Sequence, residues 1–313
     1  MSPDRGLRVW FVGGGPFAAL CLEALNGLLP LERVITGNPT RSGRGLKETP
    51  SRVEERALSL GLPLEHTGPL SRNEGLLSAL QDAPPDAVFV VDFAQLVKEP
   101  WLSAPRWGCL NIHPSLLPRW RGAAPVQRAL MNGDPETGVT VFRLVREMDA
   151  GPILRQARTP LALTDGASTL YERLSQLGAE IAVAGLRELS EGGAAWTEQD
   201  GSRATLAPKL SREEAGVSWS WDAERIHNIV RALDASGGAF AAFRGGRLKL
   251  WRTCPAEGAG PAGRILSLSG DGPVVACASG ALRLAEVQAE GKRRTGGADW
   301  ARGLRLQEGD ALA

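Results

Sequence analysis

The sequence has few of the residues that build metal sites and disulfide frameworks. It contains four cysteines and three histidines in 313 residues, and the cysteines form no C-x-x-C pair. Scattered cysteines fit a reduced cytoplasmic interior. The histidines lie far apart in the sequence without a neighbouring Cys or carboxylate cluster, which argues against zinc. We therefore expect a cytoplasmic protein that works without a metal ion.

Long apolar runs and a strong charge of one sign are also missing. No uninterrupted run approaches the ~20 apolar residues that span a bilayer, and the N-terminal stretch has no signal-peptide core, so we expect no membrane partner. The formal net charge of +1 neither predicts nor excludes a nucleic-acid partner, because local patches matter more than the total. A chain of 313 residues is long for one core, which favours two domains.

The first part of the chain alternates apolar runs with helical patterns. This alternation is typical of an α/β, Rossmann-like domain whose mostly parallel sheet is covered on both faces. Ligands of such sheets bind where the strands end. The expected strands are residues 8–12, 33–36, 87–91 and 108–112, and the expected helices are residues 51–60, 73–80 and a longer one that begins at Ser168.

The character of the sequence changes near Lys209. One helical pattern over residues 226–233 is followed by short strand-like pieces with glycines between them, at 248–251, 263–268, 274–278 and 281–287. Several short strands separated by turns predict a small β-barrel, here of OB type. We therefore predict a catalytic domain over 1–190, a linker over 191–208 and a C-terminal OB-like domain over 209–313.

A glycine pattern, Gly13-x-Gly15-x-x-Ala18, follows the first expected strand. It resembles a dinucleotide-binding fingerprint, which also requires an acidic residue near the end of the second strand to hold a ribose. That strand instead ends in Thr36-Gly37-Asn38-Pro39. The glycines are better interpreted as a tight strand-to-helix turn, and we expect no nicotinamide cofactor.

Asn111, His113 and Asp149 are the residues with the strongest chemical signal. Asn111 and His113 are two positions apart, so an extended backbone sends both side chains to the same side. A histidine beside a carboxylate is a tunable acid or base near neutral pH, and an amide donor can stabilise an oxyanion. Spacing alone leaves a second interpretation open, in which Asn111 and Asp149 bind loop backbone and His113 is a satisfied surface residue.

The residues around this cluster resemble the methionyl-tRNA formyltransferase family. Asn-x-His-x-Ser-Leu-Leu-Pro ends at Pro118, and Arg-Trp-Arg-Gly-Ala-Ala-Pro follows from Arg119. Met148-Asp149-Ala150-Gly151, Arg41-x-Gly43-Arg44-Gly45 and the run from Lys209 to Ala215 match as well. The first motif is common to folate-dependent formyltransferases of this fold, whereas the others favour the tRNA enzyme. The resemblance covers nearly the whole chain.

This resemblance implies a reaction and the residues that carry it. The formyl group of 10-formyltetrahydrofolate would move to the α-amine of initiator methionyl-tRNA. Asn111 and protonated His113 would stabilise the oxyanion, while Asp149 would keep His113 charged and help to move the amine proton. Four residues that follow the histidine fall on the family's folate-binding segment, where an apolar wall suits a flat pterin ring: Ser115, Leu116, Leu117 and Pro118.

Two basic segments are candidates for contact with tRNA. The loop at 38–47 carries Arg41, Arg44 and Lys47, and the resemblance places Arg44 on the family's key arginine for the acceptor stem. Lys292, Arg293 and Arg294 form a second run that could follow a phosphate backbone. Short charge runs are more often a solvated face, so the second assignment is the weaker one. We expect a monomer that binds initiator methionyl-tRNA and folate.

The chain departs from the family pattern at two segments near the expected folate pocket. Residues 13–17 read Gly-Gly-Gly-Pro-Phe where the family has Gly-Thr-Pro-acid-Phe, and Val91-Asp92-Phe93-Ala94-Gln95 replaces Ala-Tyr-Gly. These departures leave the detailed folate contacts open. Other functions also stay open: formyl transfer to a small amine such as glycinamide ribonucleotide or an amino sugar nucleotide, hydrolysis of the folate, and tRNA binding without catalysis.

Cys109 stands in register with Asn111 and His113, so a cysteine nucleophile paired with the histidine has to be considered. Apart from His113, no nearby residue would lower the pKa of this thiol. The reaction that the resemblance implies needs no covalent intermediate. We expect Cys109 to be a small side chain that faces the core.

Overall fold

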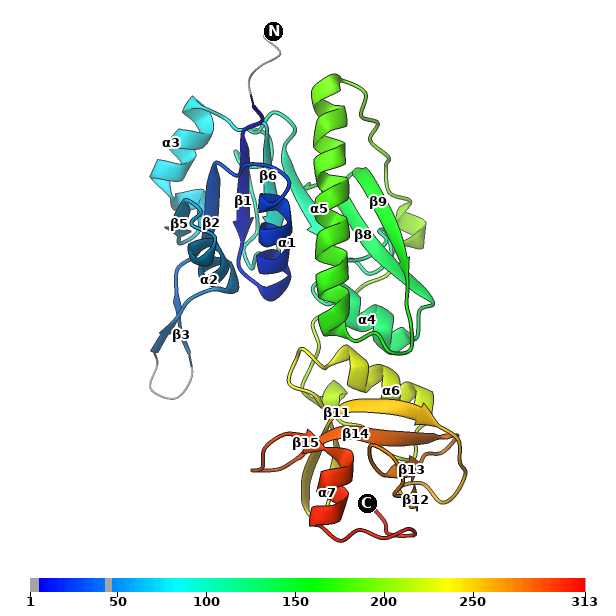
Figure 1. Ribbon diagram of the computed structural model, residues 1–313. Helices are drawn as coiled ribbons and strands as arrows, with labels where there is room; N and C mark the ends of the chain where they lie inside the picture. Colours follow the sequence, from blue (N-terminus) through cyan, green and yellow to red (C-terminus); the bar gives the residue numbers. More distant parts are fainter. Residues whose placement is uncertain (1–5, 43–46, 313) are drawn as a thin grey trace. The chain divides into compact units, whose positions relative to one another are not determined.

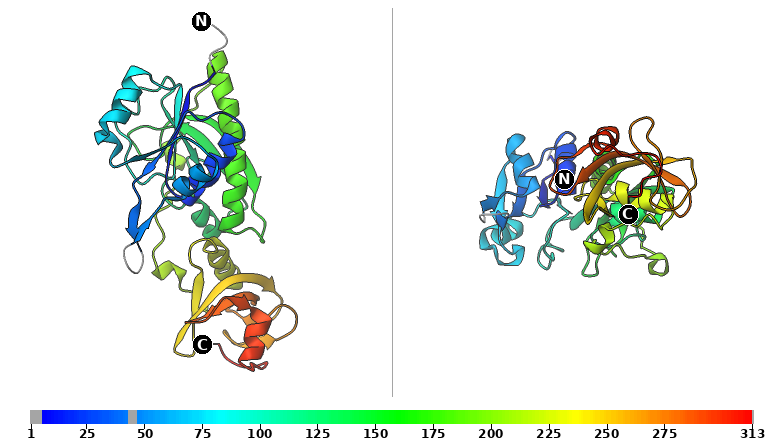
Figure 2. Two further views of the ribbon diagram at one scale, coloured as in Figure 1. Left: turned by 60° about the vertical axis from the view of Figure 1, so that its left-hand side comes forward. Right: turned by 90° about the horizontal axis from the view of Figure 1, so that it is seen from below.

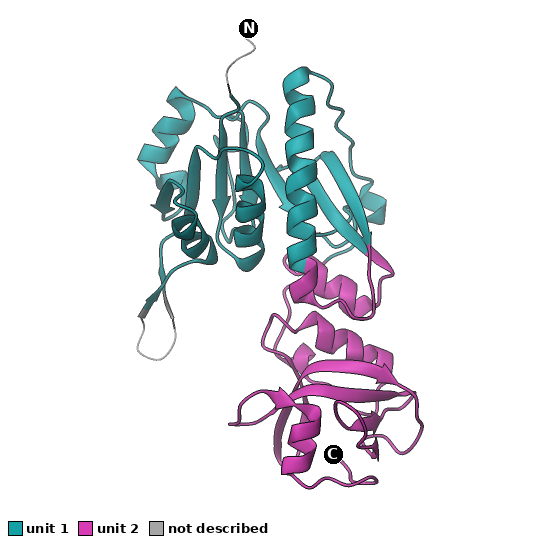
Figure 3. Ribbon diagram, viewed as in Figure 1, with its two compact units in different colours: residues 1–122, 137–159, 171–206 teal, residues 123–136, 160–170, 207–313 magenta. Residues whose placement is uncertain are grey.

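The computed structural model describes residues 6–42 and 47–312 (Figure 1). Contacts divide the chain into two compact units, coloured separately in Figure 3. The first unit holds residues 1–122, 137–159 and 171–206, and the second holds 123–136, 160–170 and 207–313. The chain therefore passes between the units several times. The domain boundaries that we set at 190 and 209 stay a prediction.

A seven-stranded sheet forms the centre of the first unit. Its strands from β5 to β7 run parallel to one another, and β8 is antiparallel to β7. Every residue of β1 and β6 is buried, as expected for strands covered on both faces. The Rossmann-like, mostly parallel sheet is confirmed. In spatial order the strands are β5 (Leu64–Thr67), β2 (Arg33–Gly37), β1 (Val9–Gly13), β6 (Ala87–Val91), β7 (Cys109–His113), β8 (Glu136–Arg143) and β9 (Ile153–Pro160).

Helices connect and cover these strands. They are α1 (Pro16–Asn26), α2 (Arg52–Ser59), α3 (Glu74–Asp82) and α5 (Ala167–Glu191), with short 3-10 turns at Leu70–Arg72 and Gly201–Arg203. The long α5 lies beside the β8–β9 side of the sheet in both views (Figure 1, Figure 2). A Cβ on Gly178 of α5 would lie 2.6 Å from the Ile112 side chain of β7. The absence of a side chain at Gly178 therefore lets α5 pack closely on the strand that carries the site.

The basic segment at 38–47 contains two short strands where we predicted a loop. β3 (Thr40–Ser42) and β4 (Lys47–Thr49) pair antiparallel, with Arg41 opposite Glu48. Arg44 lies outside the described residues, as do the side chains of Arg41 and Lys47. The proposed roles of these three residues therefore stay predictions.

The second unit is rich in β structure. Its sheet follows the order β10-β11-β14-β13-β12, with β15 paired to β14. Trp219, Ile226, Leu250, Leu284 and Trp300 belong to its buried core. Its elements are α4 (Pro125–Asn132), a 3-10 turn at Glu213–Ala215, α6 (Ala223–Ala232), β10 (Ala239–Phe243), β11 (Gly246–Ala256), β12 (Ile265–Ser267), β13 (Val274–Ala276), β14 (Ala281–Ala289), β15 (Thr295–Gly296) and α7 (Gly297–Gly303).

The closed OB-like barrel that we expected for this unit is not confirmed. Among the described residues, no pairing joins β10 to β12, so the hydrogen-bonded sheet stays open. The terminal strand β12 has only three residues, which leaves a short edge for closure. The predicted helix and the strands from 248 to 287 are present in this unit. No helix in residues 6–42 or 47–312 has the length and apolar character needed to cross a membrane.

Candidate active site

Asn111 and His113 lie on β7, on one face of the sheet. In the pairing with β8, Asn111 is opposite Phe142 and His113 is opposite Thr140. His113 is only 5% exposed, and its ring meets the edge of the Phe142 ring at a centroid distance of 6.4 Å. The interpretation of His113 as a surface residue is therefore wrong. Asn111 is half-buried, so part of its surface stays accessible.

The two ring nitrogens of His113 have different surroundings. Nε2 lies 2.8 Å from the carbonyl oxygen of Trp120, and because a carbonyl only accepts, Nε2 carries a proton. Nδ1 lies 3.9 Å from Oδ2 of Asp149, which is too far for a direct hydrogen bond. Nδ1 is thus the ring nitrogen that faces the carboxylate, while Nε2 is bound to the backbone.

Asp149 sits in a turn whose backbone and side chain are both held in place. Its φ is +50°, a region that a residue with a Cβ occupies only when its surroundings require it. Its Oδ2 accepts the backbone N–H of Gly122 at 2.8 Å. Nε2 of Gln199 donates to the carbonyl of Asp149 at 2.9 Å, and Arg121 donates to Oε1 of Gln199 at 2.7 Å. The carboxylate is therefore fixed by segments that are distant in sequence.

The loop after His113 is fastened to β8 and β9. The Thr140 hydroxyl donates to the carbonyl of Ser115 at 2.6 Å and accepts the N–H of Leu117 at 3.1 Å. Gln156 of β9 donates to the carbonyl of Leu117 at 2.7 Å. These bonds hold the loop from both sides, so it presents the Trp120 carbonyl to His113 in a defined position.

The four predicted folate-binding residues divide into two kinds. Ser115 is fully buried, and its hydroxyl donates to the carbonyl of Arg119 at 2.7 Å; Leu117 is 3% exposed. Leu116 and Pro118 are half-buried. Ser115 and Leu117 therefore shape the loop from within, while Leu116 and Pro118 keep surface that a ligand could contact.

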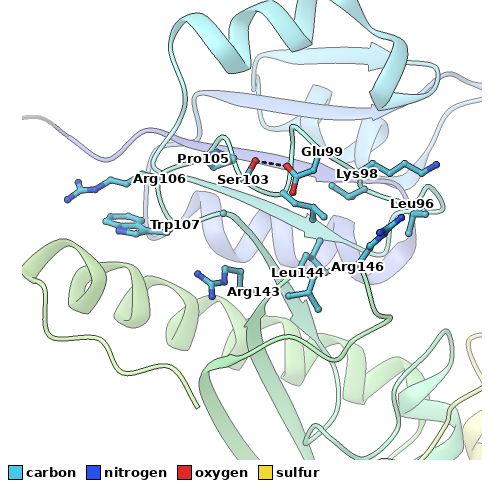
Figure 4. A pocket seen from close by; sticks show the side chains of 14 residues that line it. Leu96, Lys98, Glu99, Ser103, Pro105, Arg106, Trp107, Arg143, Leu144 and Arg146 are labelled. Carbon is cyan, nitrogen blue, oxygen red and sulfur yellow. Dashed lines mark hydrogen bonds between the residues drawn. The ribbon is translucent and has the colours of Figure 1, made fainter. Parts of the chain in front are cut away.

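A cavity of about 960 Å³ borders the strands that carry the cluster (Figure 4). Gly108 immediately precedes β7, and Arg143 is the last residue of β8. In Figure 4 Leu96 and Glu99 lie on one side and Arg143 and Leu144 on the other, while the side chain of Lys98 extends away from them. The last residue of the cavity wall, Arg146, precedes Asp149 by three positions in the sequence. The wall consists of residues 96–99, 102, 103, 105–108 and 143–146, and the predicted folate segment 115–118 is not part of it.

Family comparisons agree with this architecture. The formyl transferase model matches residues 13–186, and the model of the formyl transferase C-terminal domain matches residues 209–305. A methionyl-tRNA formyltransferase of Aromatoleum aromaticum is 38% identical over 307 residues, covering 97% of this chain and 96% of the relative. The chain belongs to the methionyl-tRNA formyltransferase family.

Solved structures share the fold of this formyltransferase. HypX from Aquifex aeolicus, solved in complex with tetrahydrofolic acid, aligns with a TM-score of 0.66 at 19% identity, over 95% of this chain and 47% of that chain. Methionyl-tRNA formyltransferase from Clostridium thermocellum aligns with a TM-score of 0.55 at 15% identity, over 80% of this chain and 94% of that chain. At these identities the likeness shows the fold alone.

Cys109 of the formyltransferase is a core residue, as predicted. Its side chain is 0% exposed, and its Sγ donates to the carbonyl of Trp101 at 3.2 Å. Burial is the main cause that raises the pKa of the Cys109 thiol, and the charge of Glu99 adds to it. A thiol in this setting stays protonated near neutral pH, which removes the chemical basis for a cysteine nucleophile.

The second basic run is exposed, but one of its members is already engaged. Lys292, Arg293 and Arg294 lie on the surface between β14 and β15. The guanidinium of Arg294 pairs with Glu286 and lies 4.8 Å from the centre of the Trp251 ring. An RNA phosphate would have to compete with Glu286 for Arg294, so Lys292 and Arg293 are the better candidates.

Sequence reasoning missed the groups that position the cluster. The Trp120 carbonyl and the Gly122 N–H are backbone groups, which leave no side-chain signal. Gln199 lies in the polar segment that we interpreted as a linker, and so does Thr205, whose hydroxyl accepts the N–H of Trp120 at 2.9 Å. This segment therefore takes part in holding the loop of the site.

Proposed function

We propose that this protein transfers the formyl group of 10-formyltetrahydrofolate to the α-amine of initiator methionyl-tRNA. The observation that carries the proposal is the approach of Nδ1 of His113 to Oδ2 of Asp149, at 3.9 Å, on the strand that also presents Asn111. Near-full-length similarity to a methionyl-tRNA formyltransferase supports the same acceptor. We assign catalysis to Asn111, His113 and Asp149.

The folate would occupy the cavity beside β7. Leu96, Val97, Leu102 and Leu144 offer apolar surface to a flat pterin ring. Lys98, Arg106, Arg143 and Arg146 lie on the same walls and would attract the carboxylates of the folate tail. The related HypX structure holds tetrahydrofolic acid, which supports a folate for this chain. Leu116 and Pro118 would contribute at the reactive end.

The reaction needs a stabilised oxyanion and one proton transfer. The amine attacks the formyl carbon, forming a carbon–nitrogen bond, and the carbonyl oxygen becomes an oxyanion. Asn111 and a proton on Nδ1 of His113 would stabilise that oxygen. Asp149 balances the charge on His113 and helps to pass the amine proton to N10 of the folate. The carbonyl then re-forms as the bond to N10 breaks, which releases tetrahydrofolate and formylmethionyl-tRNA.

The tRNA contacts would come from two basic segments. We propose that Arg41, Arg44 and Lys47 approach the acceptor stem, since arginine suits contacts with base edges and phosphates. We also propose that the C-terminal domain, with an OB-like topology left open at one edge, adds backbone contacts through Lys292 and Arg293. Arg294 would contribute only by exchanging Glu286 for a phosphate.

A single assay tests the reaction and the acceptor. Purified protein is incubated with 10-formyltetrahydrofolate and, in separate arms, with initiator methionyl-tRNA, elongator methionyl-tRNA or glycinamide ribonucleotide. Mass spectrometry detects the formylated product, and Asp149→Asn serves as the inactive control. We expect formylmethionine on the initiator tRNA only. Faster transfer to the small amine, release of formate without an acceptor, or tRNA retention without transfer would each replace this proposal by an alternative function.

A further inference from the structure

Helix α1 lacks the side-chain N-cap that α2 and α3 have. Ser51 caps α2 by accepting the N–H of Glu54, and Asn73 caps α3 by accepting the N–H of Leu76. At α1 the capping position is Gly15, which has no side chain, and no acidic residue lies in the first turn. Free N–H groups at a helix start need an acceptor.

Asp92, immediately after β6, supplies that acceptor from another segment. Burial raises the pKa of the Asp92 carboxyl, and hydrogen bonding from the backbone N–H groups of Phe17 and Ala18 in the first turn of α1 opposes that rise. The backbone carbonyl of Asp92 accepts the N–H of Gly15 at 3.1 Å. Asp92 has a φ of +43°, so the backbone adopts a strained conformation that brings the carboxylate to the helix.

The two departures from the family pattern meet at this point. A Cβ on Gly15 would lie 1.8 Å from Oδ2 of Asp92, so the family's proline cannot stand at this position while Asp92 occupies its present place. The family's acid in the first turn of α1 is replaced here by Pro16. Asp92 belongs to the second departing segment, residues 91–95, which replaces the family's Ala-Tyr-Gly. Both departures therefore involve residues at the start of α1.

Gln95, three residues after Asp92, holds the same segment by two further hydrogen bonds. Oε1 of Gln95 accepts the N–H of Leu70 at 3.0 Å, and its Nε2 donates to the carbonyl of Gly68 at 2.9 Å. The next residue, Leu96, begins the wall of the cavity and is 68% exposed. The position of this wall therefore depends on the bonds made by Asp92 and Gln95.

We propose that Asp92 and Gln95 form a clamp that positions the cavity wall at 96–98 for the folate, with Asp92 capping α1 where Gly15 has no side chain to do so. The two are positioning residues, and their effect on folate acts through Leu96. This inference rests on the proposed function, because it takes the cavity to be the folate site.

Thermal unfolding tests the pairing of Gly15 with Asp92. Gly15 has a φ of −83° and a ψ of −179°, which alanine adopts without strain, so Gly15→Ala should lower Tm only through its collision with Asp92. Asp92→Ala should also lower Tm by removing the cap. The double variant should be no less stable than Asp92→Ala alone. If the two decreases in Tm simply add, the pairing is wrong.

Folate binding tests the positioning role. Asp92→Ala and Gln95→Ala should each raise the Kd for tetrahydrofolate about tenfold, because small misplacements of a binding wall are costly. In turnover they should raise KM for 10-formyltetrahydrofolate while kcat and KM for tRNA change little. Ser51→Ala is the matched control, since it removes the cap of α2 in the same unit and should lower Tm without changing the Kd.

A rescue variant separates the two parts of the proposal. Adding Pro16→Glu to Asp92→Ala restores an acid to the first turn, so Tm should recover while the Kd stays raised. An unchanged Kd in both clamp variants, with wild-type binding intact, would leave Asp92 as a cap only and overturn the positioning role. If the wild-type protein fails to bind tetrahydrofolate, the proposed function falls with it, whereas the Tm results still decide the pairing.

Discussion

Two histidines, one in each unit, have the same burial and different surroundings. His113 and His227 are each 5% exposed, and each Nε2 lies 2.8 Å from a backbone carbonyl, of Trp120 and Leu163 respectively. The difference lies at Nδ1. In His227 it lies 2.9 Å from the hydroxyl of Thr253, which can donate to it, whereas in His113 it faces the carboxylate of Asp149.

This difference separates the histidine to which we assign catalysis from one that is held by hydrogen bonds on both nitrogens. In its neutral form His227 has a hydrogen-bond partner for both ring nitrogens. Burial is the main cause that lowers the pKa of His227. The hydrogen bond to Leu163 opposes this shift, and the charge of Arg231 adds to it. A proton on Nδ1 of His113 would instead lie between the ring and a negative charge. Burial and one carbonyl partner are common to both, so neither identifies a catalytic residue.

The sharpest test removes each histidine in turn. His113→Ala should lower kcat by ~10²–10⁴-fold, the range that acid–base groups contribute, while Tm and tRNA affinity survive. His227→Ala should lower Tm and leave kcat of the folded protein close to wild type. Steady-state formylation and thermal unfolding measure both. Equal losses of kcat in the two variants would show that His113 has no catalytic role that His227 lacks.

A smaller loss is expected when the support of Asp149 is weakened. Gln199→Ala removes the donor to the carbonyls of Asp149 and Gly151 and frees the turn that carries the carboxylate. We expect kcat to fall about tenfold, since misplacing a catalytic group is costly even when it is present. Gln288→Ala, which removes the acceptor of the Trp251 ring N–H, is the control and should keep wild-type kcat.

The lowered pKa of His227 predicts how stability depends on pH. As pH falls through about 6.5, the unfolded chain takes up a proton at this position before the folded one. The free energy of unfolding should therefore decrease below that pH, with a contribution of up to ~1.4 kcal/mol per pH unit until the folded pKa is reached. Denaturant titrations from pH 7.5 to 5 measure it. The dependence should be weaker in His227→Gln; an identical curve would contradict the assignment.

The smallest effect is expected at Cys109. Cys109→Ser keeps a donor for the Trp101 carbonyl, and stability should fall by about 1 kcal/mol, as is common for a change in a core. Turnover should stay nearly unchanged, because a buried, protonated thiol has no part in the reaction. A large loss of kcat without unfolding would support Cys109 as a nucleophile and contradict the mechanism that we propose for His113.

The sequence predicted the parts of the fold that have a local signal. The strands at β1, β6 and β7 are continuous apolar runs, and α5 shows a regular apolar stripe, so both kinds were recognised. β5, with the sequence Leu-Glu-His-Thr, was missed because only its pairing with β2 makes it a strand. The closed barrel is not confirmed, because short strands with turns indicate β structure but do not determine closure.

The same limit applies to the site. Asn111, His113 and Asp149 could be proposed because side-chain chemistry and motif are visible in the sequence, and their catalytic role stays a prediction. The carbonyl of Trp120 and the N–H of Gly122 are present at almost every residue of any chain, so no pattern marks them. Gly15 and Asp92 each appeared as an isolated departure, and only their proximity in space connects them.

The contacts of Gln199 and Thr205 bear on how the protein can be cut. A fragment that ends at residue 190 would keep Asn111, His113 and Asp149 but lose the two side chains that support Asp149 and Trp120. Proteolysis between 191 and 206 should therefore lower the formylation activity, although none of the three residues to which we assign catalysis is removed. The last segment of the first compact unit ends at residue 206. A fragment cut at 190 would therefore retain the three side chains to which we assign catalysis but lose the contacts that hold Asp149 and Trp120 in position.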